Sequence, residues 1–473
     1  MNDILCMKTF ISSSKIHWIF LLLALSTFSL RGQYIRTSYF MDKSPARTAM
    51  NPAFRPQRGY FALPVLGSLN VAYTSNGLAV EDMLYPSDGR LVTFMDPSVD
   101  AGEFLGRLGK NNAFHLDVAT NVLSMGWYHR KSFWTVDLGF KATAGLNLPK
   151  SLFELMKEGS GSQGRTYDIS NVRMFADSYA ELAVGYSHPI GRKVTVGGRL
   201  KFLAGAANVD ARIDRMQVSM YGDKWHITSQ GTLNASMQGL MAGTGVDDMG
   251  RRYIDSFELD SPGIGGYGGA IDFGVSYRVI RGLELSASVL DLGAIQWAGS
   301  STVAGVAEGD FTFDGFDLPI GGSDADPIED QLDAMIDDLT DLVHFRQLSE
   351  ADDRLEMLMP TVNFGVEYSL PSDKLSFGLL SSTRFYRSEP YTELTASVNY
   401  RPADWFSATA SYSILHSEFQ SYGFALNFSP SWINLFIASD YMITRVTPQM
   451  VPIGSHAVNV HFGLSIPMTR ARS

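Results

Sequence analysis

The chain contains residue types suited to catalysis, but none of them stands in a catalytic spacing. The glycine run GIGGYG, Gly263 to Gly268, formally matches a dinucleotide-binding loop. Such a loop opens a helix, whereas this one runs straight into an alternating stretch that begins at Ile271. The motifs Gly-x-Ser-x-Gly and His-Glu-x-x-His do not occur, and the nine histidines are scattered. We therefore predict no enzyme, no catalytic residue and no cofactor, although a Ser/His/carboxylate site assembled in space would leave no such spacing.

Metal ligands are equally poorly represented. The single cysteine is Cys6, and Asp324 and Asp326 lack the glycine and the ligand spacing of a calcium loop. These two aspartates belong to an acidic segment, residues 323–341, that holds eight of the 49 acidic residues and no basic one. From Asp330 to Val343 the apolar residues fall on one helical stripe. We predict no metal site, and an external loop with an acidic helix at about 322–345 that is either solvated or folded over a pore mouth.

The N-terminus has the order of residues found in secretory signals. Lys8 and Lys15 precede the apolar stretch from Ile16 to Leu30, and small and polar residues follow. The stretch is short for a membrane-spanning helix, so we predict a cleaved signal peptide over residues 1–32, with a retained anchor helix as the alternative. The net charge of -11 argues against a nucleic-acid partner.

Charged residues recur on one face of long alternating stretches. From Ser132 to Lys150 every even position from Trp134 to Leu148 is apolar, while Asp137 and Lys141 stand on the other face. Successive side chains of a strand point to opposite faces, so one face is apolar and the other can contact water. The same alternation places further charges on non-apolar faces, at Asp117, Glu181, Arg199 and Lys201.

Two architectures bury an apolar strand face: a soluble sandwich, in which it meets another sheet, and a membrane barrel, in which it meets lipid. The stretches are long and charged at their centres, which fits a polar lumen. We therefore predict an all-β protein, a transmembrane antiparallel β-barrel in the outer membrane of a Gram-negative bacterium. In this fold the residues predicted to face the lumen are Asp117, Asp137, Lys141, Glu181, Arg199 and Lys201.

Connection lengths give the expected strand number. Tight turns such as 129–132, 191–193 and 281–282 alternate with long connections such as 150–175 and 297–358. This spacing predicts 16 strands, or 14 if the hairpin 211–238 stands above the membrane as part of a loop. Either even number leaves both termini on the periplasmic side. A short loop helix is expected between Pro149 and Gly159, because proline opens it and glycine ends it.

Several motifs carry a family resemblance. The tetrapeptide NPAF at residues 51–54, GGRLKFLAGAANVDARID at 197–214, SVLDLGAIQW at 288–297 and YRPADWFSATASYS at 400–413 resemble a Bacteroidota family of outer-membrane barrel proteins of unknown function. More distantly, the NPA element resembles that of the long-chain fatty-acid transporter group and of barrel proteins of the type 9 secretion system. In those groups this segment forms an N-terminal hatch within the barrel.

The resemblance implies a hatch over residues 33–58 and a barrel over 59–468. Asn51 and Pro52 fix a turn, Phe54 would seat the hatch against the interior, and Arg55 and Arg58 would pair with carboxylates such as Asp117, Asp137 or Glu181. An ordinary surface turn before a strand is the alternative.

The function expected from the fold and the hatch is a hatch-gated channel for small hydrophobic molecules, with outer-membrane lipids around it. The alternative is a non-transporting barrel that binds surface or secretion-complex proteins.

Overall fold

The fold is taken from a computed structural model of the whole chain. It describes residues 36–62, 68–76, 78, 84–87, 90–159, 164–221, 224–246, 252–313, 345–415, 419–442 and 457–470. The expected signal peptide lies outside the described residues, as does the expected acidic helix except for its last position, Phe345.

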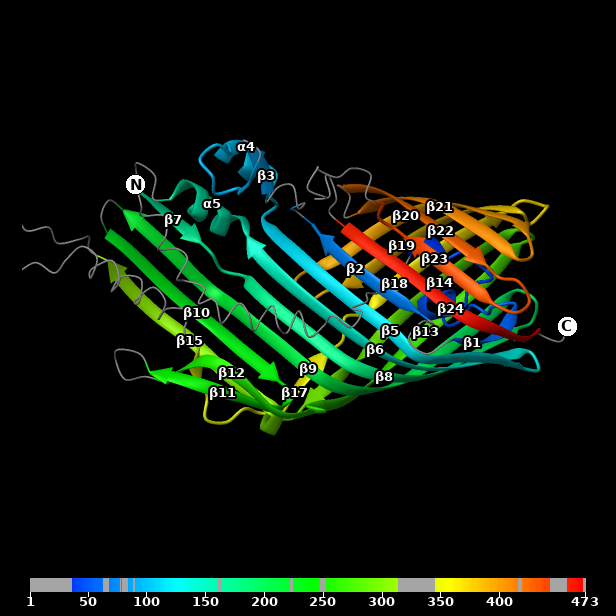
Figure 1. Cartoon of the computed structure of the whole chain (residues 1–473), viewed down its shortest axis with the longest axis horizontal. Coiled ribbons are helices and arrows are strands. Elements are labelled where there is room, and N and C mark those ends of the chain that lie inside the picture. Colours follow the sequence, from blue (N-terminus) through cyan, green and yellow to red (C-terminus); the bar gives the residue numbers. More distant parts are fainter. Residues whose placement is uncertain are drawn as a thin grey trace, which may run out of the picture.

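The described strands form a closed antiparallel barrel with 14 wall positions (Figure 1). The last strand, β24, pairs with both β1 and β2, which together make the first position, and β17 and β18 likewise share one position. In order around the wall the strands are β1 (Arg58–Ala62) with β2 (Leu69–Ser75), β5 (Asn111–His129), β6 (Ser132–Pro149), β8 (Val172–Ile190), β9 (Val194–Tyr221), β13 (Gly266–Ile280), β14 (Leu283–Trp297), β17 (Arg354–Met357) with β18 (Thr361–Ser369), β19 (Leu375–Phe385), β20 (Pro390–Ala403), β21 (Phe406–Leu415), β22 (Phe419–Phe428), β23 (Asn434–Ser439) and β24 (Ala457–Arg470).

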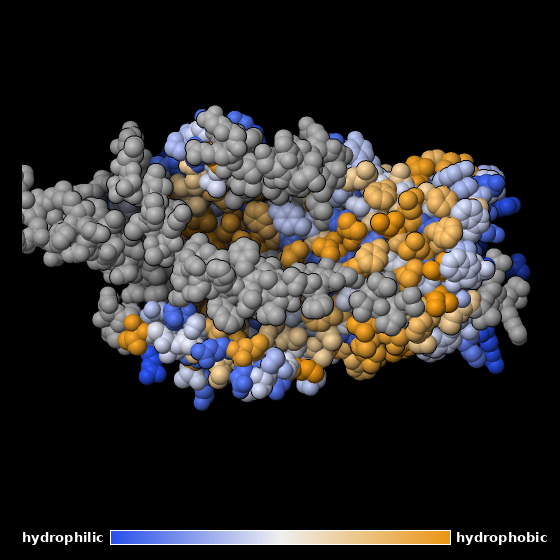
Figure 2. Space-filling model, viewed as in Figure 1, coloured by the Kyte–Doolittle hydropathy of each residue, from blue (hydrophilic) through white to orange (hydrophobic). Residues whose placement is uncertain are grey.

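Burial in the wall is inverted relative to a soluble protein. On β6, Asp137 and Lys141 are 7% and 8% exposed, whereas Leu138 on the opposite face is 39% exposed. A soluble sandwich would bury the leucine and expose the charges. Figure 2 shows outward apolar side chains, in orange, over much of the visible wall towards the short-turn end, with hydrophilic residues at that end itself. The strand alternation therefore presents apolar side chains to lipid and polar ones to the lumen.

The strand β9 explains why the wall has 14 positions and not 16. Its first half, residues 194–205, pairs with β13, and its second half, residues 208–221, pairs with β10. β10 (Lys224–Ser236) and β15 (Thr302–Phe313) thus continue β9 beyond the barrel rim as a hairpin-like extension. The 14-strand prediction, in which residues 211–238 stand above the wall, is confirmed.

The remaining elements are short and, apart from those at the N-terminal end, lie at the rim opposite the short turns or beyond it (Figure 1). They are η2 (Arg36–Ser38), α2 (Arg47–Met50), β3 (Leu84–Ser87), β4 (Arg90–Thr93), α4 (Ala101–Gly106), α5 (Lys150–Glu158), β7 (Arg165–Asp168), β11 (Gln238–Val246), β12 (Arg252–Gly263), η3 (Gly299–Ser301) and β16 (Arg346–Gln347). The helix α5 is the one expected between Pro149 and Gly159. Among the described residues, no helix is both long enough and apolar enough to cross a bilayer.

Candidate functional site in the barrel lumen

The segment before the first strand lies inside the barrel. Its described part, residues 36–57, is called the inner segment below. Tyr39, Phe40, Met50 and Phe54 of this segment pack with Leu380 of β19 in a buried cluster. The ring of Tyr39 meets those of Phe40 and Phe54 edge to face, each at 5.0 Å between centroids. The segment therefore has a small apolar core of its own within a polar lumen.

The Asn51-Pro52 turn is fastened to two wall strands. Asn51 is fully buried, and its Nδ2 donates to the carbonyl oxygens of Ala287 at 3.2 Å and Val275 at 3.4 Å. Its Oδ1 accepts from the backbone N–H of Ala53 at 2.9 Å, which closes the turn. An asparagine followed by proline suits this position, because the amide offers both donors and an acceptor while proline fixes the backbone.

The wall behind this turn consists of glycine. A Cβ atom added to Gly197 would lie 2.1 Å from the carbonyl oxygen of Pro52, and one added to Gly274 would lie 2.0 Å from Oδ1 of Asn51. Both distances are far below van der Waals contact, so the inner segment touches the wall backbone directly. The same close approach occurs at Gly365 under Tyr39, Gly378 under Phe40 and Gly423 under Thr37. These five positions, 197, 274, 365, 378 and 423, are called the glycine seat.

At its beginning the inner segment is held by charge. Arg36 Nε lies 2.9 Å from Glu393, and its backbone N–H donates to Asp440 at 3.0 Å. Thr37 donates to the same aspartate through its backbone N–H at 2.8 Å, and its hydroxyl shares a 2.7 Å hydrogen bond with Ser411. Burial alone lowers the pKa of Arg36, but the nearby Glu393 and Asp440 outweigh it and raise that pKa above its ordinary value. The guanidinium therefore stays charged at every working pH.

A layer of ion pairs occupies the lumen beside the inner segment. Lys201 Nζ lies 2.8 Å from Asp272 and 2.5 Å from Asp291, with all three side chains buried. Lys141 bridges Asp291 at 2.9 Å and Glu181 at 3.0 Å. Cations and carboxylates on neighbouring strands thus neutralise one another, which is the condition for burying charge at low cost.

Three predicted lumen residues lie in this layer, and two more, Arg199 and Asp137, form an adjoining pair at 3.1 Å. The sixth, Asp117, belongs to a second group, where it accepts from Thr143 at 2.8 Å and lies 3.4 Å from Arg384.

Asp272, Asp291, Arg384, Glu393 and Asp440 also belong to these networks, and the residue analysis did not single them out. For Asp272, Arg384, Glu393 and Asp440 the sequence signal is a position on the inward face of an alternating stretch. Asp291 gives no such signal, because it sits at a strand irregularity with a positive φ of 58°.

The expected pairing of Arg55 and Arg58 with lumen carboxylates is not what the structure has. Asp117, Asp137 and Glu181 pair with Arg384, Arg199 and Lys141 of the wall instead. Arg55 donates to the carbonyl oxygen of Lys131 at 3.0 Å, in the turn between β5 and β6, and Arg58 begins β1. The reason is position: the inner segment leaves the lumen at the short-turn end, several residues along the strands from those carboxylates.

The packed lumen leaves limited space. A cavity of about 70 Å³ separates the inner segment from the wall near Asn70, Lys141 and His461. It is lined by both apolar and charged side chains and has room for a few waters, since one water needs about 10–15 Å³. A wider recess of about 820 Å³, called the vestibule below, opens at the short-turn end between the inner segment and the turn at 191–193. With the inner segment in place, the cavity inside the lumen is too small for a drug-sized molecule, and the space of that size near the segment is the open vestibule.

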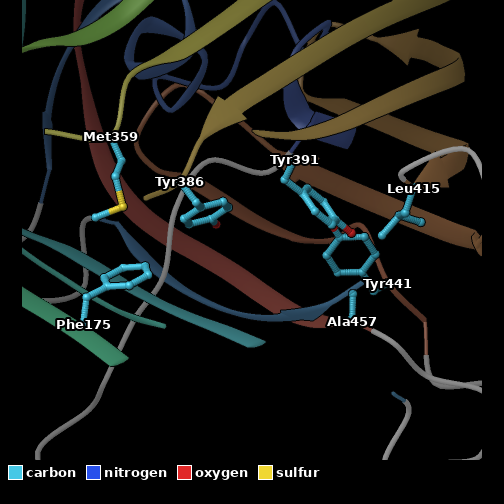
Figure 3. Close-up of a cluster of buried hydrophobic side chains, with 7 residues drawn as sticks. All are labelled: Phe175, Met359, Tyr386, Tyr391, Leu415, Tyr441 and Ala457. Carbon is cyan, nitrogen blue, oxygen red and sulfur yellow. The ribbon is translucent and has the colours of Figure 1, made fainter. Parts of the chain in front are cut away.

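Buried aromatic side chains gather near the rim opposite the short turns. Figure 3 shows them in two groups, with Phe175, Met359 and Tyr386 on one side. Tyr391, Leu415, Tyr441 and Ala457 form the other group. They come from the strand ends farthest from the short turns, so this aromatic cluster lies beyond the inner segment. Its apolar side chains include three tyrosines, whose hydroxyl groups can form hydrogen bonds.

Comparison with known proteins gives a family and distant structural likenesses. Residues 52–440 match the profile described as "Family of unknown function (DUF5723)". No curated protein matches the chain in sequence.

Two of the similar solved structures are a Pseudomonas aeruginosa FadL homologue (10% identity, TM-score 0.38, covering 93% of this chain and 99% of that one) and the P. putida toluene transporter TodX (10% identity, TM-score 0.33, covering 89% and 92%). A third is the translocator domain of the autotransporter NalP from Neisseria meningitidis (9% identity, TM-score 0.30, covering 88% and 89%). At these identities and TM-scores, the similar structures do not indicate which molecules this chain binds or transports.

Proposed function

Since the chain belongs to DUF5723, a family of unknown function, we propose a function from its own geometry: an outer-membrane channel for small hydrophobic molecules, gated by the inner segment acting as a plug. Support for the membrane comes from the outward apolar band and the buried charges. Under this proposal the short turns face the periplasm, because short turns lie on that side in outer-membrane barrels.

The observation that carries the proposal is the glycine seat. Glycine weakens a strand interior, so five glycines under one segment need a reason other than sheet stability. Here they let the segment lie on the wall without interlocking side chains, as the 2.0 Å and 2.1 Å approaches show. More than a dozen hydrogen bonds join the segment to the barrel, so under this proposal it leaves the wall as a body only when these bonds and the Arg36 pairs break together. If the segment only filled the lumen, side chains that interdigitate with those of the wall would stabilise it more.

The cargo class follows from the aromatic cluster. Under this proposal a molecule entering from the outer rim reaches Phe175, Met359 and Tyr386, two rings and a flexible thioether. In this structure Arg387 covers the Phe175 ring, and His115 and Arg384 cover the Tyr386 ring, so these side chains must part to receive it. Below them the buried charges of the ion-pair layer cross the lumen. Small hydrophobic molecules therefore gain binding energy at the cluster and advance only when the plug moves.

A reversible cross-link tests whether the plug must move. The chain has one cysteine, so Cys6→Ser gives a background in which two introduced cysteines can pair only with each other. Thr37→Cys with Ser411→Cys replaces hydroxyls that lie 2.7 Å apart and ties the plug to β21. We expect oxidised protein in liposomes to lose uptake of an apolar aromatic compound, and reduction to restore it.

The chain offers a matched control within the wall. Thr395 and Ser413 are cross-strand partners on β20 and β21 with hydroxyls 2.8 Å apart, so Thr395→Cys with Ser413→Cys forms a bond that leaves the plug free. This pair should transport equally when oxidised and reduced. Undiminished uptake with the Thr37–Ser411 bond formed would refute gating by the plug.

A second function is favoured by the hairpin of β11 and β12, whose Phe257 and Leu259 are about half exposed. This surface fits a barrel that binds a surface or secretion-complex protein. Cross-linking in intact envelopes should then recover one stoichiometric partner, and Phe257→Ser with Leu259→Ser should abolish its recovery without changing uptake.

A further inference from the structure

Positive charge gathers on one arc of the short-turn rim, in a chain whose net charge is -11. Three successive turns, those joining β5 to β6, β8 to β9 and β13 to β14, follow one another around the wall because β6 pairs with β8 and β9 pairs with β13. Together with the end of β13 they present six exposed basic residues, called the basic arc: Arg130, Lys131, Arg192, Lys193, Arg278 and Arg281.

The turns of the basic arc are tied into one surface. Ser132 and His188 share a 2.8 Å hydrogen bond between the first and second turns. The backbone N–H of Arg278 donates to the carbonyl oxygen of Lys193 at 2.7 Å between the second and third. The cations are therefore held at fixed spacing along the rim and are not carried by independent loops.

None of the six basic-arc side chains forms an ion pair with a described residue, although Lys193 Nζ donates to the carbonyl oxygen of Val279 at 3.2 Å. The lumen cations behave differently, since Lys141, Lys201 and Arg384 each lie within 3.4 Å of a carboxylate. On the opposite arc the turns carry mixed charge, with Asp373 beside Lys374 and Asp404 close to Lys43. Glu284 stands opposite Arg278 in the strand register and lines the same vestibule, so the excess positive charge of the basic arc is carried mainly by its turn residues, Arg130, Lys131, Arg192, Lys193 and Arg281.

The basic arc begins where the apolar band ends. Ile190 and Ile280 are 57% and 60% exposed and face outward at the last strand positions. Arg192 and Arg281 follow one or two residues later, so they lie within roughly 10 Å of the hydrocarbon edge at about 3.3 Å per residue. That is the depth of lipid phosphates, where basic residues attract anionic lipids.

We propose that the basic arc binds the phosphate groups of anionic phospholipids in the leaflet at the short-turn end. The proposal rests on the membrane embedding in the proposed function but not on transport or on the plug. A zwitterionic lipid offers no net charge to the six cations, so the arc selects by charge. It would hold one side of the barrel rim against the leaflet, beside the vestibule that Arg192, Lys193 and Arg278 also line.

The test uses the full chain in phosphatidylcholine nanodiscs containing a minority of phosphatidylglycerol. After detergent extraction, native mass spectrometry counts the phosphatidylglycerol that stays with the protein. Arg192→Gln with Lys193→Gln should reduce this retention by roughly thirtyfold, the factor that corresponds to two basic residues at an anionic surface. The matched control removes two exposed cations at the other end of the barrel, through Lys110→Gln with Arg252→Gln, and should retain the lipid fully.

Equal retention by the two double variants would overturn the proposal. So would loss of the bound lipid when inorganic phosphate is added at the same phosphorus concentration, since the arc would then recognise a free anion. Retention lowered by an acidic soluble protein but unaffected by the arc substitutions would also count against a lipid site. Failure of the unsubstituted protein to enter phosphatidylcholine discs would instead contradict the membrane embedding itself, which keeps the two proposals separable.

Discussion

Replacing one glycine of the seat should open the channel without unfolding the barrel. In Gly274→Ala the new Cβ would stand 2.0 Å from Asn51 Oδ1, 2.9 Å from Pro52 Cδ and 3.0 Å from the Ala53 nitrogen. Ordinary contact begins at about 3.4 Å, so the Asn51 side chain must move by about 1 Å or more. The wall cannot yield as easily, because β13 is hydrogen-bonded to β9 on one side and to β14 on the other.

The size of the effect follows from the hydrogen bonds that this movement breaks. Asn51 loses its bonds to the Ala287 carbonyl and the Ala53 N–H, at 3.2 Å and 2.9 Å. Two buried bonds contribute about 2–3 kcal/mol together. The balance between seated and displaced plug should therefore shift by roughly 30- to 150-fold. Conductance in planar bilayers, measured per folded protein, should rise accordingly.

Gly198→Ala is the control, because a Cβ there meets nothing closer than the Asp272 carbonyl oxygen at 3.5 Å. It lies next to the seat on β9 and carries the same chemical change. Both variants should keep the heat-dependent gel mobility of a folded barrel. If Gly274→Ala folds and conducts like Gly198→Ala, the plug does not depend on the glycine seat and the argument fails.

Three further outcomes follow from the wall and its charges. Leu200→Arg places a cation on the outward face of β9, where the leucine is 51% exposed. Urea titrations in vesicles should show the folded barrel destabilised by about 2–4 kcal/mol. An unchanged stability would contradict a lipid-facing surface. Lys201→Met leaves Asp272 and Asp291 without their shared cation, so the same titration should show a loss of about 3–5 kcal/mol, partly recovered in Lys201→Arg. Arg36→Gln removes the guanidinium that pairs with Glu393 and Asp440, while the backbone N–H bond to Asp440 remains. Conductance should rise while the barrel stays folded; a closed channel would show that these ion pairs do not hold the plug.

Much of the wall could be predicted from local pattern. Each strand carries its own period of two, so the eight alternations around Asp137 and Lys141 identify β6 without any knowledge of its neighbours. Short turns are equally local, and those at 129–132, 191–193 and 281–282 fall where the structure has them. The sequence pattern alone does not decide between 14 and 16 wall positions, because β9 has one unbroken strand pattern. Only its change of partner, from β13 to β10, shows where the wall ends and the extension begins.

The pairing inside the lumen could not be predicted in the same way. Alternation gives the face of Glu181 or Arg199, but the partner depends on strand stagger and on irregularities such as the one at Asp291. The same holds for the glycine seat, since Gly197 and Gly274 look like ordinary strand glycines until the path of the inner segment is known. The placement of the hatch rested on a resemblance, and its function as a plug remains a prediction.

The closure of the barrel constrains the order in which it can assemble. The inner segment continues directly into β1, and β1 pairs with β24 near the other end of the chain. Once that pairing has formed, a segment covalently joined to the first strand can reach the enclosed space only through the short-turn end. If residues 36–57 pack against the curling sheet while its two edges are still apart, they avoid that route, and the segment that occupies the finished lumen also gives the sheet a surface to fold around.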